Sequence, residues 1–401
     1  MAGKSLALTA LAVLGVLTAG PAAAQGAKTP GVTATEIKIG QTNPYSGPAS
    51  SYGTIGKVEA AYFNMINEKG GINGRKINFI SLDDGYSPPK TVEQVRRLVE
   101  QDEVLMLFQT LGTPPNSAIH KYMNQKKVPH LFVATGATKW GDPEHFPWTM
   151  GWQPNYQVES HIYAKWLMQT KPAAKIGILY QNDDYGKDYV KGLKDELGAK
   201  AAKMIVAELS YEVTDPTIDS QIVSLKGSGA DVFFNVTIPK FAAQAIRKAH
   251  DIEWHPLHLL NSVSNSIGGV LEPAGLDKSV GTVSSAYYKD PADPQYADEP
   301  AMKEWVAFMK KYYPEGNLAD GFNLYGYLVA QTLVQTLKQC GNDLSRENVM
   351  REAAKLDMTL PLLLDGIKIK TGPKDFRPIK QMRLEKFDGK RWVLFGDAIT
   401  G

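Results

Sequence analysis

Four short apolar runs recur at nearly equal intervals in the middle of the chain: Ile176-Gly177-Ile178-Leu179, Met204-Ile205-Val206, Val232-Phe233-Phe234 and Leu257-His258-Leu259-Leu260. Their centres lie 28, 28 and 26 residues apart. A continuous apolar run is typical of a strand that is buried on both faces of a parallel sheet. A repeat of this length accommodates one strand, one crossover helix and two short loops. The segment therefore predicts an α/β fold with parallel sheets and right-handed crossovers.

A second set of apolar runs lies nearer the N-terminus, at residues 77–80, 104–108 and 131–133. The regular spacing stops in the segment that follows, where Gly141-Asp142-Pro143, Pro147 and Pro154 fall. Because this gap separates the two strand sets, we expect two α/β lobes with a boundary near Met150 to Gln153.

The last part of the chain is predicted to be mainly helical, with one apolar stripe through Met302, Trp305 and Met309 and a longer apolar helix from Leu324 to Leu337. Residues 382–395 then alternate around Asp388-Gly389, which predicts a β-hairpin. These final helices have no strand set of their own. We therefore expect the chain to pass between the two lobes more than once.

The first 24 residues have the pattern of an export signal. Lys4 precedes an apolar stretch from Leu6 to Leu17, and Ala22-Ala23-Ala24 forms a small-residue cleavage site before Gln25. We expect a signal peptide over residues 1–24 and a mature protein in the periplasm. A retained membrane anchor is the alternative, although the apolar stretch is short for a membrane span.

The composition is that of an ordinary globular protein, with 43% hydrophobic and 21% charged residues. About 375 residues follow the export segment, enough for two domains. The 44 Lys and Arg residues nearly balance the 42 Asp and Glu residues, and no basic stripe indicates a nucleic-acid partner. The single cysteine, Cys340, excludes a disulfide within the chain.

The sequence contains no Walker A loop and no HExxH, CxxC or GxSxG motif. His255 and His258 are the closest pair of histidines, and Pro256 between them argues against a helical metal pair. We therefore expect no catalytic site, no metal and no cofactor, which argues against an enzyme.

The candidate site lies in the loops that follow the strands, because open parallel sheets bind ligands at the carboxyl ends of their strands. After residues 104–108, Gly112 permits close backbone approach and Thr113 offers a hydroxyl at a helix start that suits an anion. A second small-and-hydroxyl loop contains Gly136, Ala137 and Thr138. Two such loops would suit a carboxylate; ordinary strand-to-helix turns are the alternative interpretation.

Three aromatic residues are placed to enclose the same space. Tyr185 follows the 176–179 strand, where a residue of the second lobe would meet a ligand. Trp152 and Tyr156 fall at the first crossing between the lobes. Aromatic residues near a hinge are also common as core residues or in the packing between lobes, which is the alternative interpretation.

Taken together, the chain resembles the periplasmic solute-binding proteins of branched-chain amino acid type that serve ABC importers. The resemblance covers Gly31 to Gly401. It is carried by Gly31-Val32-Thr33, Glu36-Ile37-Lys38-Ile39-Gly40, Pro44-Tyr45-Ser46-Gly47-Pro48, Ile66-Asn67-Glu68-Lys69-Gly70-Gly71-Ile72-Asn73-Gly74-Arg75, Leu111-Gly112-Thr113, Gln181-Asn182-Asp183-Asp184-Tyr185-Gly186 and Gly229-Ala230-Asp231-Val232.

This resemblance implies the type I periplasmic binding protein fold, with two Rossmann-like lobes, parallel sheets and a three-strand hinge. It implies a first lobe from residues 34–151 and 287–369, and a second from residues 152–286 and 370–401. The ligand would be trapped between them and delivered to a permease, and importer docking favours a monomer. The predicted ligand-binding residues are Tyr52, Leu111, Gly112, Thr113, Gly136, Ala137, Thr138, Trp152, Tyr156, Tyr185, Thr237 and Ser262.

The chain departs from the amino-acid binders of this family at two places. Those binders hold the ligand ammonium with an acid after the last strand of the second lobe, where this chain has Asn261-Ser262-Val263-Ser264-Asn265. They also tend to place an aromatic residue where this chain has Val236-Thr237-Ile238-Pro239. A buried ammonium without a carboxylate partner is costly. We therefore expect a carboxylate ligand with an aromatic or apolar body, whose distal end meets Thr237 and Ser262.

Three alternatives stay open. The ligand could be an amino acid or amide, with its ammonium held by Asp183 or Asp184. The chain could be a sensory ligand-binding domain that feeds a signalling partner. It could also be a secreted hydrolase on an α/β scaffold, which would require a nucleophile with a base in reach.

Overall fold

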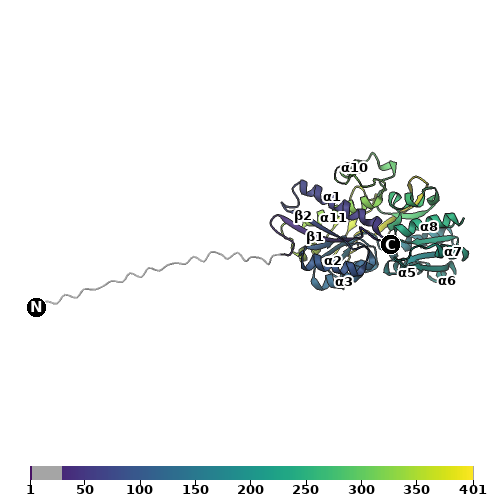
Figure 1. Ribbon diagram of the computed structural model, residues 1–401, viewed down its shortest axis with the longest axis horizontal. Helices are drawn as coiled ribbons and strands as arrows, with labels where there is room; N and C mark the ends of the chain where they lie inside the picture. Colours follow the sequence, from purple (N-terminus) through teal and green to yellow (C-terminus); the bar gives the residue numbers. More distant parts are fainter. Residues whose placement is uncertain (2–28, 401) are drawn as a thin grey trace.

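The computed structural model describes residue 1 and residues 29–400, arranged around two separate sheets (Figure 1). The first sheet is entirely parallel and has the strand order β2-β1-β3-β4-β5. Its strands are β1 (Glu36–Asn43), β2 (Lys76–Asp83), β3 (Met106–Phe108), β4 (His130–Val133) and β5 (Thr149–Gly151). Its helices are α1 (Gly53–Glu68), α2 (Pro88–Glu100), α3 (Thr113–Lys126), α10 (Pro300–Tyr312), α11 (Gly321–Gln339) and α12 (Arg346–Ala353).

The second sheet has the order β14-β13-β10-β9-β8-β6-β7. Its strands are β6 (Ile176–Gln181), β7 (Ile205–Tyr211), β8 (Val232–Val236), β9 (Leu257–Leu260), β10 (Val283–Ala286), β13 (Gln381–Phe387) and β14 (Trp392–Thr400). The strands from β7 to β10 are parallel, and β13 and β14 form an antiparallel hairpin at the edge. Its main helices are α4 (Tyr156–Thr170), α5 (Asp184–Leu197), α7 (Asp219–Gly227) and α8 (Pro239–Asp251).

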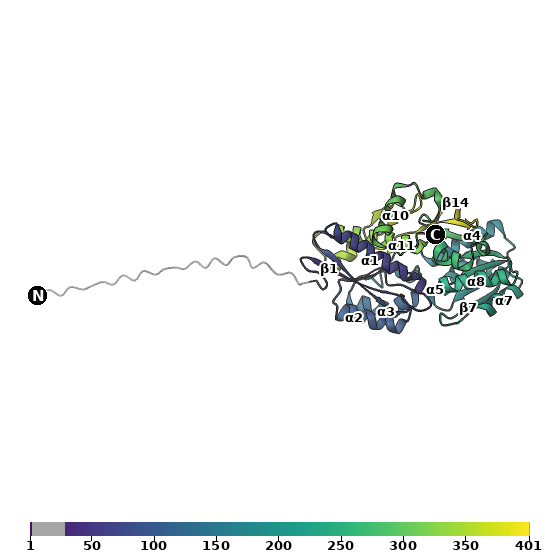
Figure 2. The same ribbon diagram turned by 45° about the horizontal axis from the view of Figure 1, so that its top comes forward.

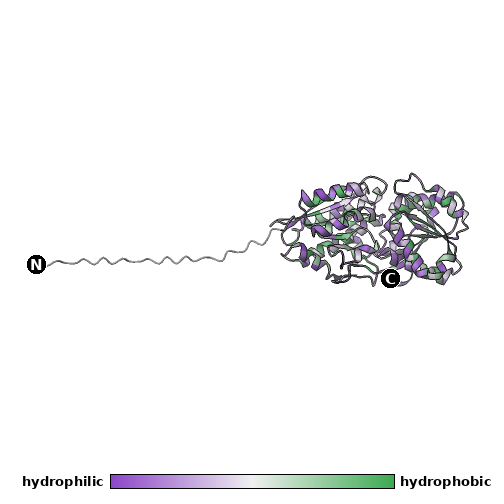
Figure 3. Cartoon of the chain, turned by 90° about the horizontal axis from the view of Figure 1, so that it is seen from below, coloured by the Kyte–Doolittle hydropathy of each residue, from purple (hydrophilic) through white to green (hydrophobic). Residues whose placement is uncertain are grey.

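Short elements complete the fold. They are η1 (Ser50–Tyr52), η2 (Thr138–Gly141), η3 (Gly198–Lys200), α6 (Ala201–Met204), η4 (Ser262–Ser264), η5 (Ile267–Leu271), α9 (Glu272–Ala274), η6 (Asp277–Ser279), η7 (Pro294–Tyr296), β11 (Asp357–Met358) and β12 (Ile369–Lys370). Figure 2 shows α1 and α11 beside the first sheet and α5, α7 and α8 around the second. In Figure 3 hydrophilic and hydrophobic residues alternate along the outer helices, as expected for helices with one buried face.

All seven strands predicted from apolar runs are present, and so is the C-terminal hairpin. Strand β8 is buried at every position, as a continuous apolar run requires. The run at residues 104–108 becomes a strand only from Met106. Its first two carbonyls, those of Val104 and Leu105, accept hydrogen bonds from the Arg346 guanidinium at 2.8 and 3.0 Å instead of from a neighbouring strand.

The chain passes between the two sheets three times: between β5 and α4, between β10 and α10, and between β12 and β13. The α/β fold with two lobes is therefore as predicted. We propose that the first lobe comprises residues 34–151 and 287–369, and the second lobe residues 152–286 and 370–401, as expected from the sequence. The predicted signal peptide, residues 1–24, lies outside the described residues except for Met1. In residues 29–400, no helix combines the length and the apolar character that crossing a membrane requires.

Two buried carboxyl groups lie beside the second crossing. Asp290, four residues after β10, accepts a hydrogen bond from the Ala292 N–H at 2.9 Å, and its other oxygen has no partner among the described residues. Glu385 of β13 is 2% exposed and accepts from the Asn265 amide at 2.8 Å. Burial raises the pKa of Asp290 to about 7, and the nearby Asp293 acts in the same direction. Burial also raises the pKa of Glu385.

We expect Asp290→Asn to stabilise the protein at pH 8 more than at pH 5. The folded protein holds the Asp290 proton up to a pKa of about 7, against an ordinary value of 3.8. The favourable contribution of the protonated group is complete below the ordinary value and is lost as the pH rises through about 7. The asparagine removes this loss, so the gain at pH 8 should be on the order of 1 kcal/mol or more.

Denaturant unfolding at the two pH values measures the difference. Asp277→Asn is the matched control, because Asp277 is exposed and forms no ion pair within residues 29–400. Equal gains at pH 5 and pH 8 for Asp290→Asn would contradict the expectation.

Candidate functional site

A cavity lies between the two lobes, where loops from both sheets meet at the carboxyl ends of their strands. It contains about 560 Å³ of space that no protein atom fills, mouth included. Its walls are formed by Tyr52, Ile55, Tyr86, Leu111, Gly112, Thr113, Ala134, Gln153, Tyr156, Tyr185, Ile238, Ser262, Val263, Tyr287, Tyr288, Phe322 and Tyr325.

The cavity wall is strongly aromatic and carries no ionisable acid or base other than phenols. Seven tyrosines and Phe322 contribute to it, whereas no Asp, Glu, His, Lys or Arg side chain does. Burial raises the pKa of Tyr52, Tyr86 and Tyr185, so these phenols stay neutral. The remaining polar side chains are the Thr113 and Ser262 hydroxyls and the Gln153 amide. A charged ligand group would therefore meet only neutral hydrogen-bonding groups.

The first-lobe wall is built around Gly112, the residue before α3. Its φ of 97° is one that residues with a side chain rarely adopt. A Cβ at this position would lie 2.3 Å from the Tyr86 ring. The Tyr86 ring thus packs directly against the backbone at the start of α3. Pro114 and Pro115 follow Thr113 and have no N–H, so the Thr113 N–H and hydroxyl are the donors at this helix start.

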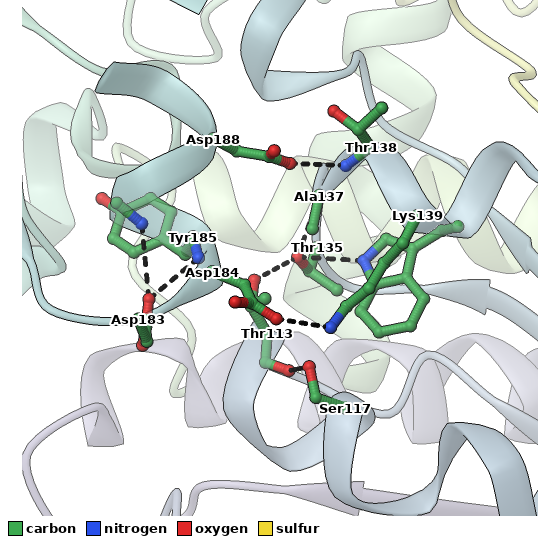
Figure 4. A network of polar contacts seen from close by, with 12 residues as sticks. Thr113, Ser117, Thr135, Ala137, Thr138, Lys139, Asp183, Asp184, Tyr185 and Asp188 are labelled. Carbon is green, nitrogen blue, oxygen red and sulfur yellow. Dashed lines mark hydrogen bonds and ion pairs between the residues drawn. The ribbon is translucent and has the colours of Figure 1, made fainter. Parts of the chain in front are cut away.

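A chain of hydrogen bonds extends from Thr113 into the first lobe (Figure 4). The Thr113 and Thr135 hydroxyl oxygens lie 2.6 Å apart. The Thr135 oxygen also accepts hydrogen bonds from the Trp140 indole N–H and the Ala137 N–H, both at 3.3 Å. Thr135 is 1% exposed, so its hydrogen bonds are confined to buried neighbours.

The second-lobe wall is held by a buried carboxylate behind Ser262. Glu159 of α4 is 1% exposed. Its Oε1 accepts from the Ser262 N–H at 2.7 Å and the Tyr163 hydroxyl at 2.9 Å. Its Oε2 accepts from the Ser262 hydroxyl at 2.7 Å and the Tyr189 hydroxyl at 2.6 Å. Burial raises the pKa of Glu159, while these four hydrogen bonds act to lower it.

Direct contacts join the lobes around the cavity, so the structure is in a closed form. The Tyr52 hydroxyl donates to the Val263 carbonyl at 2.8 Å. At the rim, the Thr138 N–H donates to Asp188 and Lys139 pairs with Asp184, both at 2.6 Å (Figure 4).

Seven of the predicted site residues line this cavity: Tyr52, Leu111, Gly112, Thr113, Tyr156, Tyr185 and Ser262. The loop Gly136-Ala137-Thr138 instead lines a separate small cavity with Trp140 and Arg377. Trp152 is fully buried behind the wall, where its indole N–H donates to Thr332 at 3.1 Å. Thr237 is also buried, and its hydroxyl donates to Asn235 at 2.7 Å.

Sequence reasoning missed most of the aromatic wall. Tyr287 and Tyr288 directly follow β10, where the chain crosses between the lobes for the second time. Phe322 and Tyr325 belong to the apolar helix α11. Nothing in the periodicity of that helix separates cavity residues from core residues. Glu159 was missed because a single acid in a helix normally lies on its solvent face.

No group of three or more His, Cys, Asp or Glu side chains that could hold a metal ion is found in the part of the chain that the structure describes. Asp183, considered from the sequence as a partner for a ligand ammonium, forms hydrogen bonds within the protein instead. Asp183 caps α5 by accepting from the Tyr185 and Gly186 N–H groups at 2.9 and 3.3 Å. Burial raises the pKa of Asp183 to about 6.

The family model described as periplasmic binding protein matches residues 36–391. The chain belongs to the periplasmic binding proteins. Members of this family bind small molecules and work with the permeases of ABC importers. The resemblance recognised in the sequence is therefore confirmed.

Curated relatives are distant in sequence. An amino acid binding protein of Pseudomonas aeruginosa is 23% identical over 317 residues, which cover 76% of this chain and 79% of the relative. The Leu/Ile/Val-binding protein homolog 1 of Brucella suis is 26% identical over 318 residues, covering 77% and 80%.

Solved structures share the fold. A fatty acid ABC transporter substrate-binding protein from Thermomonospora curvata is 23% identical, with a TM-score of 0.77 over 94% of this chain and 95% of that one. A branched chain amino acid ABC transporter protein from Thermus thermophilus with bound valine is 15% identical, with a TM-score of 0.82 over 92% and 97%. At these identities the likeness concerns the fold alone.

We expect Gly112→Ala to destabilise the protein more than Gly74→Ala. Both glycines have positive φ, 97° and 77°, but a Cβ at Gly74 would meet nothing within 4 Å. Gly74→Ala should therefore cost only the backbone strain, about 1–2 kcal/mol. Gly112→Ala should cost roughly 1–3 kcal/mol more, because the Tyr86 ring has to move. Denaturant unfolding measures both costs, and equal values would show that the Tyr86 ring does not constrain this site.

Proposed function

We propose that this chain is a periplasmic substrate-binding protein that captures a small organic acid with an aromatic or apolar body and delivers it to an ABC importer permease. In this role it acts as a monomer, is exported by a signal peptide over residues 1–24, and is not an enzyme. The observation that carries the ligand assignment is the composition of the cavity: seven tyrosines, Phe322 and no charged side chain. Such a wall suits a flat or apolar body.

Thr113 is the proposed anchor of the carboxylate. The indole N–H of Trp140 and the N–H of Ala137 can only donate, and both point to the Thr135 oxygen. Since its two lone pairs are occupied by these donors, we infer that Thr135 directs its own proton to the Thr113 oxygen, 2.6 Å away. The Thr113 proton is then available to the cavity, beside the Thr113 N–H. Two donors at a helix start form a suitable site for one carboxylate.

The absence of an acid in the wall argues against a free amino acid. An ammonium group in this cavity would lose its hydration without gaining a carboxylate partner, which is costly. The two acids considered from the sequence are engaged elsewhere, since Asp183 caps α5 and Asp184 pairs with Lys139. Among the structural relatives, the fatty acid transporter protein is named for a carboxylate with an apolar body and no ammonium.

Amino acid binding is the second candidate, because the names of the curated relatives favour it. Titration calorimetry separates the two candidates, with benzoate and cinnamate as one group of probes and leucine and valine as the other. Tight binding of an aromatic acid supports the proposal. Tight binding of leucine with no response to the aromatic acids overturns the ligand assignment and leaves the family unchanged.

We expect Thr113→Val to weaken binding of the aromatic acid by about 10-fold or more. The substitution keeps the shape of the side chain and removes one hydrogen bond to a charged group, which is worth about 1.5–3 kcal/mol. Ser117→Ala is the control, since the Ser117 hydroxyl donates to the Thr113 carbonyl and does not line the cavity. Calorimetry with the same acid measures both variants. Unchanged affinity in Thr113→Val would exclude Thr113 as the anchor.

A further inference from the structure

The hydrogen-bonding direction of Ser262 is fixed by the carboxylate behind it. Both donors of Ser262, its N–H and its hydroxyl, are directed to Glu159 at 2.7 Å. A serine hydroxyl has one proton and two lone pairs. Because the proton is used, Ser262 offers the cavity only oxygen lone pairs. The Glu159 oxygens also face the hydroxyls of Tyr163 and Tyr189, and the Tyr163 proton is shared with the Leu260 carbonyl at 3.0 Å.

The side chains next to Ser262 on this wall offer the cavity no further donors. The Val263 carbonyl already accepts from the Tyr52 hydroxyl, and the Ser264 hydroxyl is directed to the Thr237 carbonyl, away from the cavity. The Asn261 amide donates to the carbonyls of Asn235 and Thr237. The side-chain donors of the turn from Asn261 to Ser264 are therefore directed into the protein.

Thr113 and Ser262 thus have opposite hydrogen-bonding character. The first-lobe wall presents the donors of Thr113, and the second-lobe wall presents the acceptor of Ser262 and the Tyr185 hydroxyl, which has no hydrogen-bond partner among the described residues. A ligand that satisfies both carries an acceptor group at one end and a donor group at the other.

We propose that the ligand is a hydroxylated acid, whose carboxylate meets Thr113 and whose hydroxyl donates to Ser262, with Glu159 as the residue that positions Ser262. This proposal rests on the proposed function, since it takes an organic acid as the ligand class. A hydroxyl rather than an ammonium is the donor because Glu159 does not line the cavity and its oxygens are already occupied by Ser262, Tyr189 and Tyr163.

Pairs of acids that differ in a single hydroxyl group test directly whether the ligand donates a hydrogen bond to Ser262. The pairs are benzoate with 4-hydroxybenzoate and cinnamate with 4-hydroxycinnamate, and the 4-methoxy acids serve as probes that can only accept. Titration calorimetry of the full mature protein should give about 10-fold or higher affinity for the hydroxylated member of a pair, since one buried hydrogen bond is worth about 1 kcal/mol and an unpaired Ser262 oxygen costs more.

Ser262→Ala should remove this preference. Binding of the hydroxylated acid should fall to the level of its partner, while binding of the partner stays within about twofold. Ser264→Ala is the matched control, because Ser264 lies on the same turn and does not line the cavity. It should keep the preference.

Glu159→Gln tests the positioning role separately. The Ser262 N–H can only donate, so the Gln carbonyl must take the place of Oε1 and the Gln amide that of Oε2. That amide donates to the Ser262 oxygen and releases the serine proton to the cavity. Preference should then shift from the hydroxy acid toward the methoxy acid. A merely structural role of Glu159 would weaken both acids alike.

The outcomes separate the two proposals. Equal binding of hydroxylated and plain acids by the wild-type protein, or equal loss of both in Ser262→Ala, overturns the hydroxyl assignment and leaves the organic acid proposal intact. Binding of leucine or phenylalanine without binding of any aromatic acid overturns both. If Glu159→Gln does not fold, Ser262→Ala and Ser264→Ala still decide the question.

Discussion

The carboxylate of Glu159 connects the parts of the second lobe that face the cavity. It lies on α4, and its four donors come from α4 itself, from Tyr189 of α5 and from the turn after β9. A buried carboxyl group of this kind is tolerated only when its oxygens are hydrogen-bonded. Loss of any one partner leaves part of that group unsatisfied, so the helices and the turn hold one another in place. The position of Ser262 in the cavity wall follows from this arrangement.

Charge is distributed very differently at the rim and inside the cavity. At the rim, Lys139, Asp184 and Asp188 join the lobes through contacts that remain partly exposed to solvent. Such exposed pairs contribute little free energy each and are weakened by salt. Inside, the wall contains only phenols, hydroxyls, one amide and apolar groups. The rim therefore suits reversible closure, and the interior determines which solute favours the closed form.

The sequence was informative where a residue's role depends on local backbone. Strand spacing predicted both parallel sheets, and the loops after those strands contain Gly112, Thr113 and Tyr185, which line the cavity. It was uninformative where the role depends on packing between distant segments. Glu159 and Ser262 are 103 residues apart, and nothing local indicates that they meet. Trp152 and Thr237 fall at plausible positions, yet Thr332 and Asn235 take their hydrogen bonds and hold them in the interior.

The edge hairpin of the second sheet affects how the molecule can assemble during synthesis. Strand β10 ends at Ala286, but its antiparallel partner β13 begins only at Gln381, after the helices that cover the first sheet. A nascent chain that has been synthesised only as far as β10 therefore lacks the edge strands β13 and β14 of the second sheet. It also lacks helices α10, α11 and α12 of the first lobe. Neither half can reach its final structure until almost the whole polypeptide has been made, so the two halves must complete folding together.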